Sequence, residues 1–189
     1  MVRKTAEERR AEALAAAREI IATEGIGHAT VRTVAERAGM SAGSLRHIFP
    51  QHDDLFVALL EDAAPRVAER AQRVLAAGLA AGRPTEEVAL DVLLEVVPTR
   101  PDTRVEALTQ LAVLTAHGGH AGVRRARVAA GDGLDALCRA LVGPGEDARE
   151  LRLVVDGLVL HILERDPAEG KVRALLARVL GRMDVRPIG

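Results

Sequence analysis

The chain is poor in aromatic side chains: its 189 residues include no tryptophan, no tyrosine and only two phenylalanines. Both of these, Phe49 and Phe56, lie in the first third of the chain. A cage of aromatic rings is the usual site for a flat organic cation, and the remaining two thirds have no Phe, Tyr or Trp with which to build one. Any small-molecule site there is therefore expected to be aliphatic, with a few polar groups.

Cysteine is nearly absent as well. The single Cys138 excludes a disulfide within one chain, and its neighbours Leu134, Leu137 and Leu141 indicate a core position rather than a redox-sensing one. The N-terminus has no apolar run typical of a signal peptide. The longest weakly charged stretch, residues 107–123, is too short and too polar to span a membrane. These features predict a cytoplasmic protein with no membrane partner.

Charge is almost balanced, with a formal net charge of −1. Residues 1–50 hold eight Arg or Lys and six Asp or Glu, a net of +2, and the rest of the chain has a net of −3. This asymmetry permits a basic face but does not by itself predict nucleic-acid binding. A basic cluster at the N-terminus fits either a flexible arm that touches DNA phosphates or the minor groove, or a solvated helix start; it consists of Arg3, Lys4, Arg9 and Arg10.

The features of an enzyme are missing. The glycines lack the preceding strand and the following Lys-Ser/Thr of a phosphate-binding loop, and no nucleophile stands with a paired acid and base. His117 and His120 flank Gly118-Gly119, but a metal site needs more converging ligands than two histidines and a distant aspartate. We therefore expect no enzymatic activity, no cofactor and no metal site.

What the sequence does contain is a helix-turn-helix pattern in residues 30–49. Two short amphipathic segments flank the joint Ala38-Gly39-Met40-Ser41. Gly39 can adopt the left-handed backbone that ends the first helix, and the Ser41 hydroxyl can accept a hydrogen bond from a free backbone N–H and so start the second. Two helices joined by such a turn can place a recognition helix in the major groove of DNA.

Helical spacing divides these two segments into a buried face and a polar face. The apolar residues recur at i, i+3, i+4 and i+7, and they are Val31, Val34, Ala35 and Ala38 in the first helix and Leu45, Ile48 and Phe49 in the second. The opposite face of the second helix carries Gly43, Ser44, Arg46 and His47. An ordinary helical hairpin with a solvated polar face would show the same pattern, so the pattern alone leaves the function open.

The polar face suits the floor of a DNA groove. Arg46 has the planar donor fork that matches guanine O6 and N7, and Ser44 and His47 can reach bases or phosphates. Gly43 has no side chain, so the helix can approach the DNA backbone closely at this position.

This stretch, with the helix before it and the residues after it, resembles the DNA-binding domain of the TetR/AcrR family of transcriptional regulators. The family pattern is a long first helix that ends in glycine, then the helix-turn-helix, then the opening of a fourth helix. The residues in register with it are Gly25, Thr30, Val31, Arg32, Ala35, Ala38, Gly39, Ser41, Gly43, Leu45, Phe49 and Leu55. The detailed match covers about the first third of the chain.

Three positions depart from the family pattern. Its two usual tyrosines are Arg46 and Ile48 here, and the usual lysine of the fourth helix is His52. The motif therefore offers fewer hydroxyl and ammonium groups to DNA phosphates, and Arg46 and His47 carry more of the predicted readout. The predicted DNA-binding residues are Thr30, Arg32, Ser41, Gly43, Ser44, Arg46, His47 and His52.

Outside residues 30–49 the pattern is helical throughout as well, because Val, Leu and Ala recur at helical spacing and Pro or Gly separates the segments. A first helix begins near Thr5, where Thr5-Ala-Glu-Glu8 matches a capping box. Further helices are predicted over residues 52–81, 85–97, 102–117, 121–142, 147–164 and 168–182. The sequence thus predicts an all-α fold of about nine helices, and the resemblance implies a DNA-binding domain over 1–50 and an effector-binding and dimerisation domain over 51–189.

The last two predicted helices carry wide apolar stripes. In the resembled family these helices pair with their copies in a four-helix dimer bundle, which implies a homodimer. Gly157 in mid-helix costs about 1 kcal/mol of helix propensity against alanine, and a close approach of two helices would offset that loss. The predicted interface residues are Val154, Val155, Gly157, Leu158, Ile162, Leu176, Val179 and Leu180. Two recognition helices about 34–36 Å apart would read a near-palindrome.

The resemblance also implies a small-molecule effector that binds within the C-terminal helices and releases the operator DNA. Such release requires tighter effector binding to the DNA-free state. The candidate polar groups are Gln110, Thr115, His117, Cys138, Asp156 and His161. The predicted function is a ligand-responsive regulator of double-stranded DNA, with repression the family's usual mode. The alternative is a small-molecule sensor or interaction protein that keeps the helix-turn-helix shape with weak or no operator binding.

Overall fold

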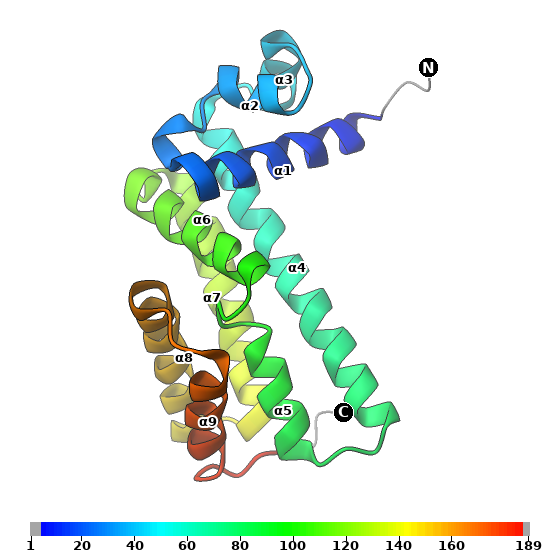
Figure 1. Ribbon diagram of the computed structural model, residues 1–189, viewed down its shortest axis with the longest axis vertical. Coiled ribbons are helices and arrows are strands. Elements are labelled where there is room, and N and C mark those ends of the chain that lie inside the picture. Colours follow the sequence, from blue (N-terminus) through cyan, green and yellow to red (C-terminus); the bar gives the residue numbers. More distant parts are fainter. Residues whose placement is uncertain (1–4, 187–189) are drawn as a thin grey trace. The chain divides into compact units, whose positions relative to one another are not determined.

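A computed structural model describes residues 5–186, and all regular elements in that range are helical (Figure 1). In chain order they are α1 (Ala6–Glu24), the short 3-10 helix η1 (Ile26–His28), α2 (Val31–Arg37), α3 (Ala42–Ile48), α4 (His52–Ala80), α5 (Thr85–Leu94), α6 (Pro101–His117), α7 (Ala121–Val142), α8 (Glu146–Arg165) and α9 (Glu169–Leu180). The predicted all-α fold of nine helices is confirmed for this part of the chain.

The predicted helix ends agree with the structure to within a few residues, and the largest difference is at the end of α5. Apolar residues continue the helical pattern to Val97, but the helix ends at Leu94. The N–H groups of Val96 and Val97 both bond the carbonyl of Leu93, at 3.0 and 3.3 Å. This tight turn buries Val97 without prolonging the helix, so periodicity alone overstates its length.

The chain packs as two units. One contains the residues up to Asp62 together with Val105–Arg127, and the other contains Ala63–Arg104 together with the residues from Val128 onward. Helices α4, α6 and α7 each contribute to both. These units do not coincide with the predicted ranges 1–50 and 51–189, which remain a prediction about where the two functions lie.

In the first unit, α1, α2 and α3 pack against one another around a single core (Figure 1). The buried face of α1 is in that core, with Leu14, Ile20 and Ile21 almost fully covered. The first turns of α4 complete it with Leu55 and Phe56. The capping box at the start of α1 is also present, since the Glu8 N–H donates to Thr5 Oγ1 at 3.1 Å and the Thr5 N–H donates to Glu8 Oε2 at 2.7 Å.

The second unit has its own core, formed mainly by α5, α7, α8 and α9. One side of α8 and one side of α9 pack in this core. Leu151, Val155 and Leu176 are fully buried there. Close packing of α4 on α5 depends on Gly78, because a Cβ there would lie 2.6 Å from Val88 Cγ2. Within residues 5–186 no helix combines the length and apolar character that crossing a lipid bilayer demands.

Candidate functional site

The joint between α2 and α3 has the geometry of a helix-turn-helix. Gly39 adopts a φ of +65°, which is the left-handed backbone that ends a helix with little strain at glycine. The Met40 N–H then bonds the carbonyl of Ala35 at 2.9 Å and closes the turn. Ser41 caps α3, since its Oγ accepts a hydrogen bond from the Ser44 N–H at 3.0 Å. The predicted roles of Gly39 and Ser41 in this joint are confirmed.

Helix α3 is amphipathic in the sense required of a recognition helix. Leu45 is 1 % exposed and the adjoining Phe49 is 2 % exposed, and both pack in the core of the first unit. On the other side Arg46 and His47 are exposed, and the structure gives neither of them a hydrogen bond or ion pair within residues 5–186. Their donors therefore face solvent and are available to a nucleic acid.

Helix α2 is held in place by ion pairs to α1. The Arg37 guanidinium lies 2.7 Å from Glu19 Oε1 and 2.7 Å from Glu24 Oε1. These carboxylates raise the pKa of Arg37, chiefly through its hydrogen bond to Glu24. The ion pairs fix α2 on α1, and α3 packs against α2. Sequence spacing did not indicate these ion pairs.

Thr30, Arg32, Ser41, Gly43 and His52 are exposed as well, whereas Ser44 is half-buried. Thr30 caps α2, because its Oγ1 accepts from the Thr33 N–H at 3.2 Å while the Thr30 N–H donates to Thr33 Oγ1 at 3.0 Å. Arg32 is exposed on the first turn of α2. His52 is exposed at the start of α4, where its ring lies edge-on to Phe56 with the ring centroids 4.9 Å apart.

Arg32 and Thr30 are expected to act on DNA phosphates. Replacing Arg32 by alanine should weaken binding to all duplexes alike. It should also make the slope of log K against the logarithm of the salt concentration shallower by about one. Replacing Thr30 by alanine should also weaken binding to all duplexes. It should in addition destabilise the protein by about 1 kcal/mol because a helix cap is lost. Salt titrations of binding and urea unfolding measure the two effects. A change in base preference without a change in salt dependence would contradict the Arg32 assignment.

The basic cluster predicted at the N-terminus is described only in part, since Arg3 and Lys4 lie outside the described residues. Arg9 and Arg10 lie on α1. The Arg10 guanidinium stands 5.0 Å from the centre of the Phe49 ring, and Arg9 Nε donates to the Thr5 carbonyl at 3.4 Å. Both therefore have contacts within the protein.

A histidine cluster that the sequence did not predict lies between the first turns of α4 and the end of α6. His117, at the end of α6, stacks on Phe56 with the ring centroids 4.1 Å apart, and its Nδ1 lies 2.9 Å from Asp53 Oδ1. His52 approaches the same rings from the side. Both Asp53 and His52 belong to the first turn of α4, so this cluster ties the end of α6 to the helix that follows the helix-turn-helix.

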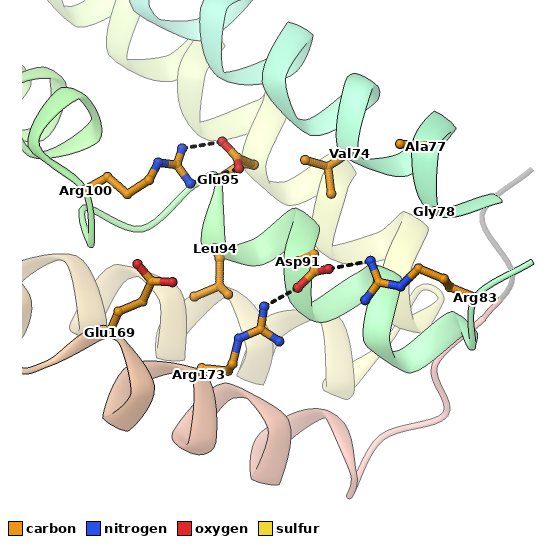
Figure 2. A pocket seen from close by; sticks show the side chains of 10 residues that line it. All are labelled: Val74, Ala77, Gly78, Arg83, Asp91, Leu94, Glu95, Arg100, Glu169 and Arg173. Carbon is orange, nitrogen blue, oxygen red and sulfur yellow. Dashed lines mark hydrogen bonds and ion pairs between the residues drawn. The ribbon is translucent and has the colours of Figure 1, made fainter. Parts of the chain in front are cut away.

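A pocket of about 510 Å³ lies in the second unit. Figure 2 shows its walls, which come from the last turns of α4, from α5 and the segments beside it, and from the start of α9. Six of the ten lining residues are charged and none is aromatic. The lining residues are Val74, Ala77, Gly78, Arg83, Asp91, Leu94, Glu95, Arg100, Glu169 and Arg173.

Ion pairs organise the charged walls of this pocket. Asp91 Oδ2 accepts from Arg83 at 2.7 Å and Asp91 Oδ1 accepts from Arg173. Both oxygens of Glu95 accept from Arg100. Burial pushes the pKa of Asp91 upward, but the hydrogen bonds and charges of Arg83 and Arg173 together outweigh it and hold that pKa below its usual value. The carboxylate is therefore ionised at neutral pH.

None of the six residues predicted to bind an effector lines this pocket. Gln110, Thr115 and His117 belong to the first unit, where the Thr115 hydroxyl donates to its own helix at 3.0 Å. In the second unit Asp156 is paired with Arg152 Nε at 2.9 Å, and His161 is exposed. The charged pocket thus differs from the aliphatic one expected from composition.

Cys138, the sixth of these residues, is fully buried in the core of the second unit. Burial raises the pKa of its thiol to about 11, and the reactive species of a cysteine is the thiolate. We expect Ellman's reagent to titrate no thiol in the native protein at neutral pH and one thiol per chain after unfolding in guanidinium. Rapid reaction of the native protein would show that Cys138 is accessible.

The predicted dimer residues have two different environments. Val155, Leu158, Ile162, Leu176 and Leu180 are at most 5 % exposed and belong to the core of a single chain. Val154 and Val179 are half-buried beside that core, and Gly157 is exposed. The apolar residues that α8 leaves open are Leu153, 72 % exposed, and Leu160, 51 % exposed. They lie one turn to either side of Gly157.

Comparisons with known proteins agree with this geometry. Residues 13–59 match the model of the tetR family of bacterial regulatory proteins. The chain is 30 % identical over 170 residues to the HTH-type transcriptional regulator PksA of Bacillus subtilis (strain 168), and the match covers 83 % of this chain and 80 % of that protein. Among solved structures, a transcriptional regulator from Rhodococcus sp. Rha1 superposes with a TM-score of 0.77 at 23 % identity, which covers 94 % of this chain and 99 % of the other.

A second solved structure adds a bound ligand. The multidrug binding protein EbrR complexed with malachite green has a TM-score of 0.68 and 31 % identity, over 91 % of this chain and 98 % of that one. The family model covers the residues that form α2, α3 and the start of α4, and the match to PksA extends over most of the chain. The chain belongs to the TetR family of transcriptional regulators and carries that family's helix-turn-helix DNA-binding domain.

Proposed function

We propose that this regulator binds a near-palindromic operator as a homodimer, represses transcription from it, and is released by a small-molecule effector. The observation that carries the proposal is the exposed polar face of α3, where Arg46 and His47 have no partner within residues 5–186. Repression follows physically when a dimer on a promoter blocks polymerase. The protein acts in the cytoplasm, where its DNA lies, and it has no enzymatic role.

The readout follows from the chemistry of each group. Arg46 donates to guanine O6 and N7 in the major groove, and Ser44 and His47 contact neighbouring bases or phosphates. Thr30, Arg32 and His52 bind phosphates and set the register of α3 on the duplex. Ser41 caps α3, and Gly43 lets the start of that helix approach the DNA backbone.

The dimer surface lies on the exposed face of α8. Leu153, Gly157 and Leu160 follow one another at i, i+4 and i+7, which places them on one side of the helix. Nothing lies within 4 Å of a Cβ built on Gly157, so its flat surface is open to a second helix. This face replaces the buried members of the predicted interface, since Val155 and Leu158 already pack inside one chain.

The dimer is tested by replacing Leu153 and Leu160 together by aspartate. Both side chains are exposed in a single chain, so the fold of each chain should persist. A second copy should no longer pack against α8, because the aspartates would be buried there. We expect the unchanged protein to sediment as a dimer and the double variant as a monomer with unchanged helix content. Leu79, 53 % exposed at the end of α4, supplies the control as Leu79→Asp. Dimers of equal stability in all three proteins would rule this face out.

The effector site is the pocket of the second unit. Two features support this assignment: its size is within the range of about 300–1,000 Å³ typical of small-molecule sites, and EbrR, which has the same fold, binds malachite green. Effector binding must favour the DNA-free state, and operator DNA must weaken effector binding by the same factor.

The alternative function is a sensor or interaction protein with weak or no operator binding. The replacement of two family tyrosines and one lysine by Arg46, Ile48 and His52 is the observation in its favour. Selection of bound duplexes from a random pool decides between the two functions. Enrichment of a two-fold symmetric motif supports the regulator, and a pool that stays random after selection supports the alternative.

A further inference from the structure

We propose that the pocket of the second unit binds a small zwitterion, a molecule with one ammonium and one carboxylate on an aliphatic frame. The free aliphatic amino acids are the simplest members of this class. The inference gives a chemical class to the effector and rests on the proposed function only for the regulatory role of the pocket. Binding itself is argued from the lining residues alone.

The charges that line the pocket are balanced. The lining holds three guanidinium groups and three carboxylates, namely Arg83, Arg100, Arg173, Asp91, Glu95 and Glu169. A ligand with a net charge would leave one sign in excess in a partly desolvated site, which is unfavourable. A ligand that carries one charge of each sign preserves the balance.

Two of the three carboxylates already pair with arginines. Asp91 accepts from two arginines, Arg83 and Arg173. Glu95 is paired with Arg100 and lies 3.5 Å from Arg70 Nε. These two carboxylates are only 19 % and 14 % exposed. A cationic ligand would have to displace a guanidinium from a half-buried position to reach either of them.

Two charged side chains of α9 remain available to a ligand. Glu169 is exposed and has no hydrogen bond or ion pair within residues 5–186. Arg173, 46 % exposed, donates to Asp91 through one terminal nitrogen, which leaves most of its five N–H donors to a ligand. Glu169 and Arg173 lie at i and i+4 on α9, so they share one face of that helix. An ammonium can pair with Glu169 while a carboxylate on the same ligand pairs with Arg173.

The uncharged part of the lining suits an aliphatic frame. The remaining lining residues are small or aliphatic, with Val74 and Ala77 on α4 and Leu94 on α5 (Figure 2). No aromatic ring lines the pocket, so a flat aromatic cation has no face on which to stack. A short aliphatic side chain fits this surface.

The test is isothermal titration calorimetry of the full chain at neutral pH without DNA. Three probes share one aliphatic frame: leucine carries both charges, isocaproate only the carboxylate, and isoamylamine only the ammonium. We expect leucine to bind at least about tenfold more tightly than either analogue, since each analogue lacks one charge-assisted contact. The inference is overturned if leucine does not bind, or if isocaproate or isoamylamine binds equally well.

Two variants locate the site. Glu169→Gln and Arg173→Gln keep side-chain size close to the original and remove one charge each, and each should weaken leucine binding by about tenfold or more. Glu86 and Arg139 are exposed and outside the lining, so Glu86→Gln and Arg139→Gln should bind leucine as the unchanged protein does. Circular dichroism checks that all four variants fold. Unchanged leucine affinity in both pocket variants would place the site elsewhere and overturn the inference.

Leucine added to the protein on its selected operator separates this inference from the proposed function. If leucine binds in the pocket but leaves the protein on its operator, the zwitterion site stands and its role as effector site is wrong. If no operator is found but leucine binds, the proposed regulatory function is wrong and the zwitterion site stands.

Discussion

Replacing Phe56 by alanine is expected to lower the free energy of unfolding by about 3–5 kcal/mol, the usual range for an aromatic side chain removed from a core. Phe56 is 1 % exposed and is among the largest fully buried side chains of the described residues. It joins the core of the first unit to the stacked ring of His117. The variant therefore loses both apolar burial and an aromatic contact.

Urea unfolding followed by far-UV circular dichroism measures this effect, because a chain without tryptophan or tyrosine has little intrinsic fluorescence. Phe56→Leu is the matched control, since it keeps an apolar side chain and should lose much less. DNA binding should fall in parallel with the folded fraction, because α3 packs on the same core. A loss below about 1 kcal/mol in Phe56→Ala would mean that the site collapses around the missing ring.

Replacing Arg46 by alanine should weaken specific DNA binding by about 1–3 kcal/mol and relax the preference at one base pair. The guanidinium is exposed on α3, and the structure gives it no partner in residues 5–186, so the change removes a contact with DNA and none within the protein. Protein stability should stay the same, which distinguishes this variant from Phe56→Ala.

The measurement is binding to the selected operator and to duplexes that differ from it at single base pairs. Arg125, exposed on α7, provides a charge-matched control as Arg125→Ala. If Arg46→Ala selects the same motif with the same strength as the unchanged protein, then Arg46 does not read a base. His47 would then be the group on which the readout depends.

Sequence reasoning was most successful in the helix-turn-helix, for physical reasons. The buried and exposed faces of α3 alternate with the helical period because Leu45 and Phe49 must pack on α1. The joint needs a glycine with positive φ and a helix cap, and Gly39 and Ser41 are among the few residue types that supply them. Local chemistry thus sets local structure, and both can be read from adjacent residues.

The pocket was missed because distant residues build it. Asp91 pairs with Arg173, which lies 82 positions further along the chain, and no local pattern brings the two together. The absence of aromatic residues correctly indicated a pocket without rings, but composition could not reveal that its walls are charged.

The choice of a dimer face depends on long-range packing as well. Helix α8 carries apolar residues on more than one side, and the sequence does not say which side the rest of the chain covers. The structure buries Leu151 and Val155 in its own core and leaves Leu153 and Leu160 exposed. Packing against residues far along the chain therefore decides which apolar side of α8 stays exposed to a partner.

The central claim is that the exposed face of α3 reads a DNA sequence, and the specificity ratio tests it most directly. Fluorescence anisotropy at one fixed, physiological salt concentration compares a duplex carrying the selected operator with a scrambled duplex of equal length. We expect the operator to bind about 10³–10⁷ times more tightly, as it does for specific regulators. A ratio near one, with both duplexes bound only through their phosphates, would contradict it.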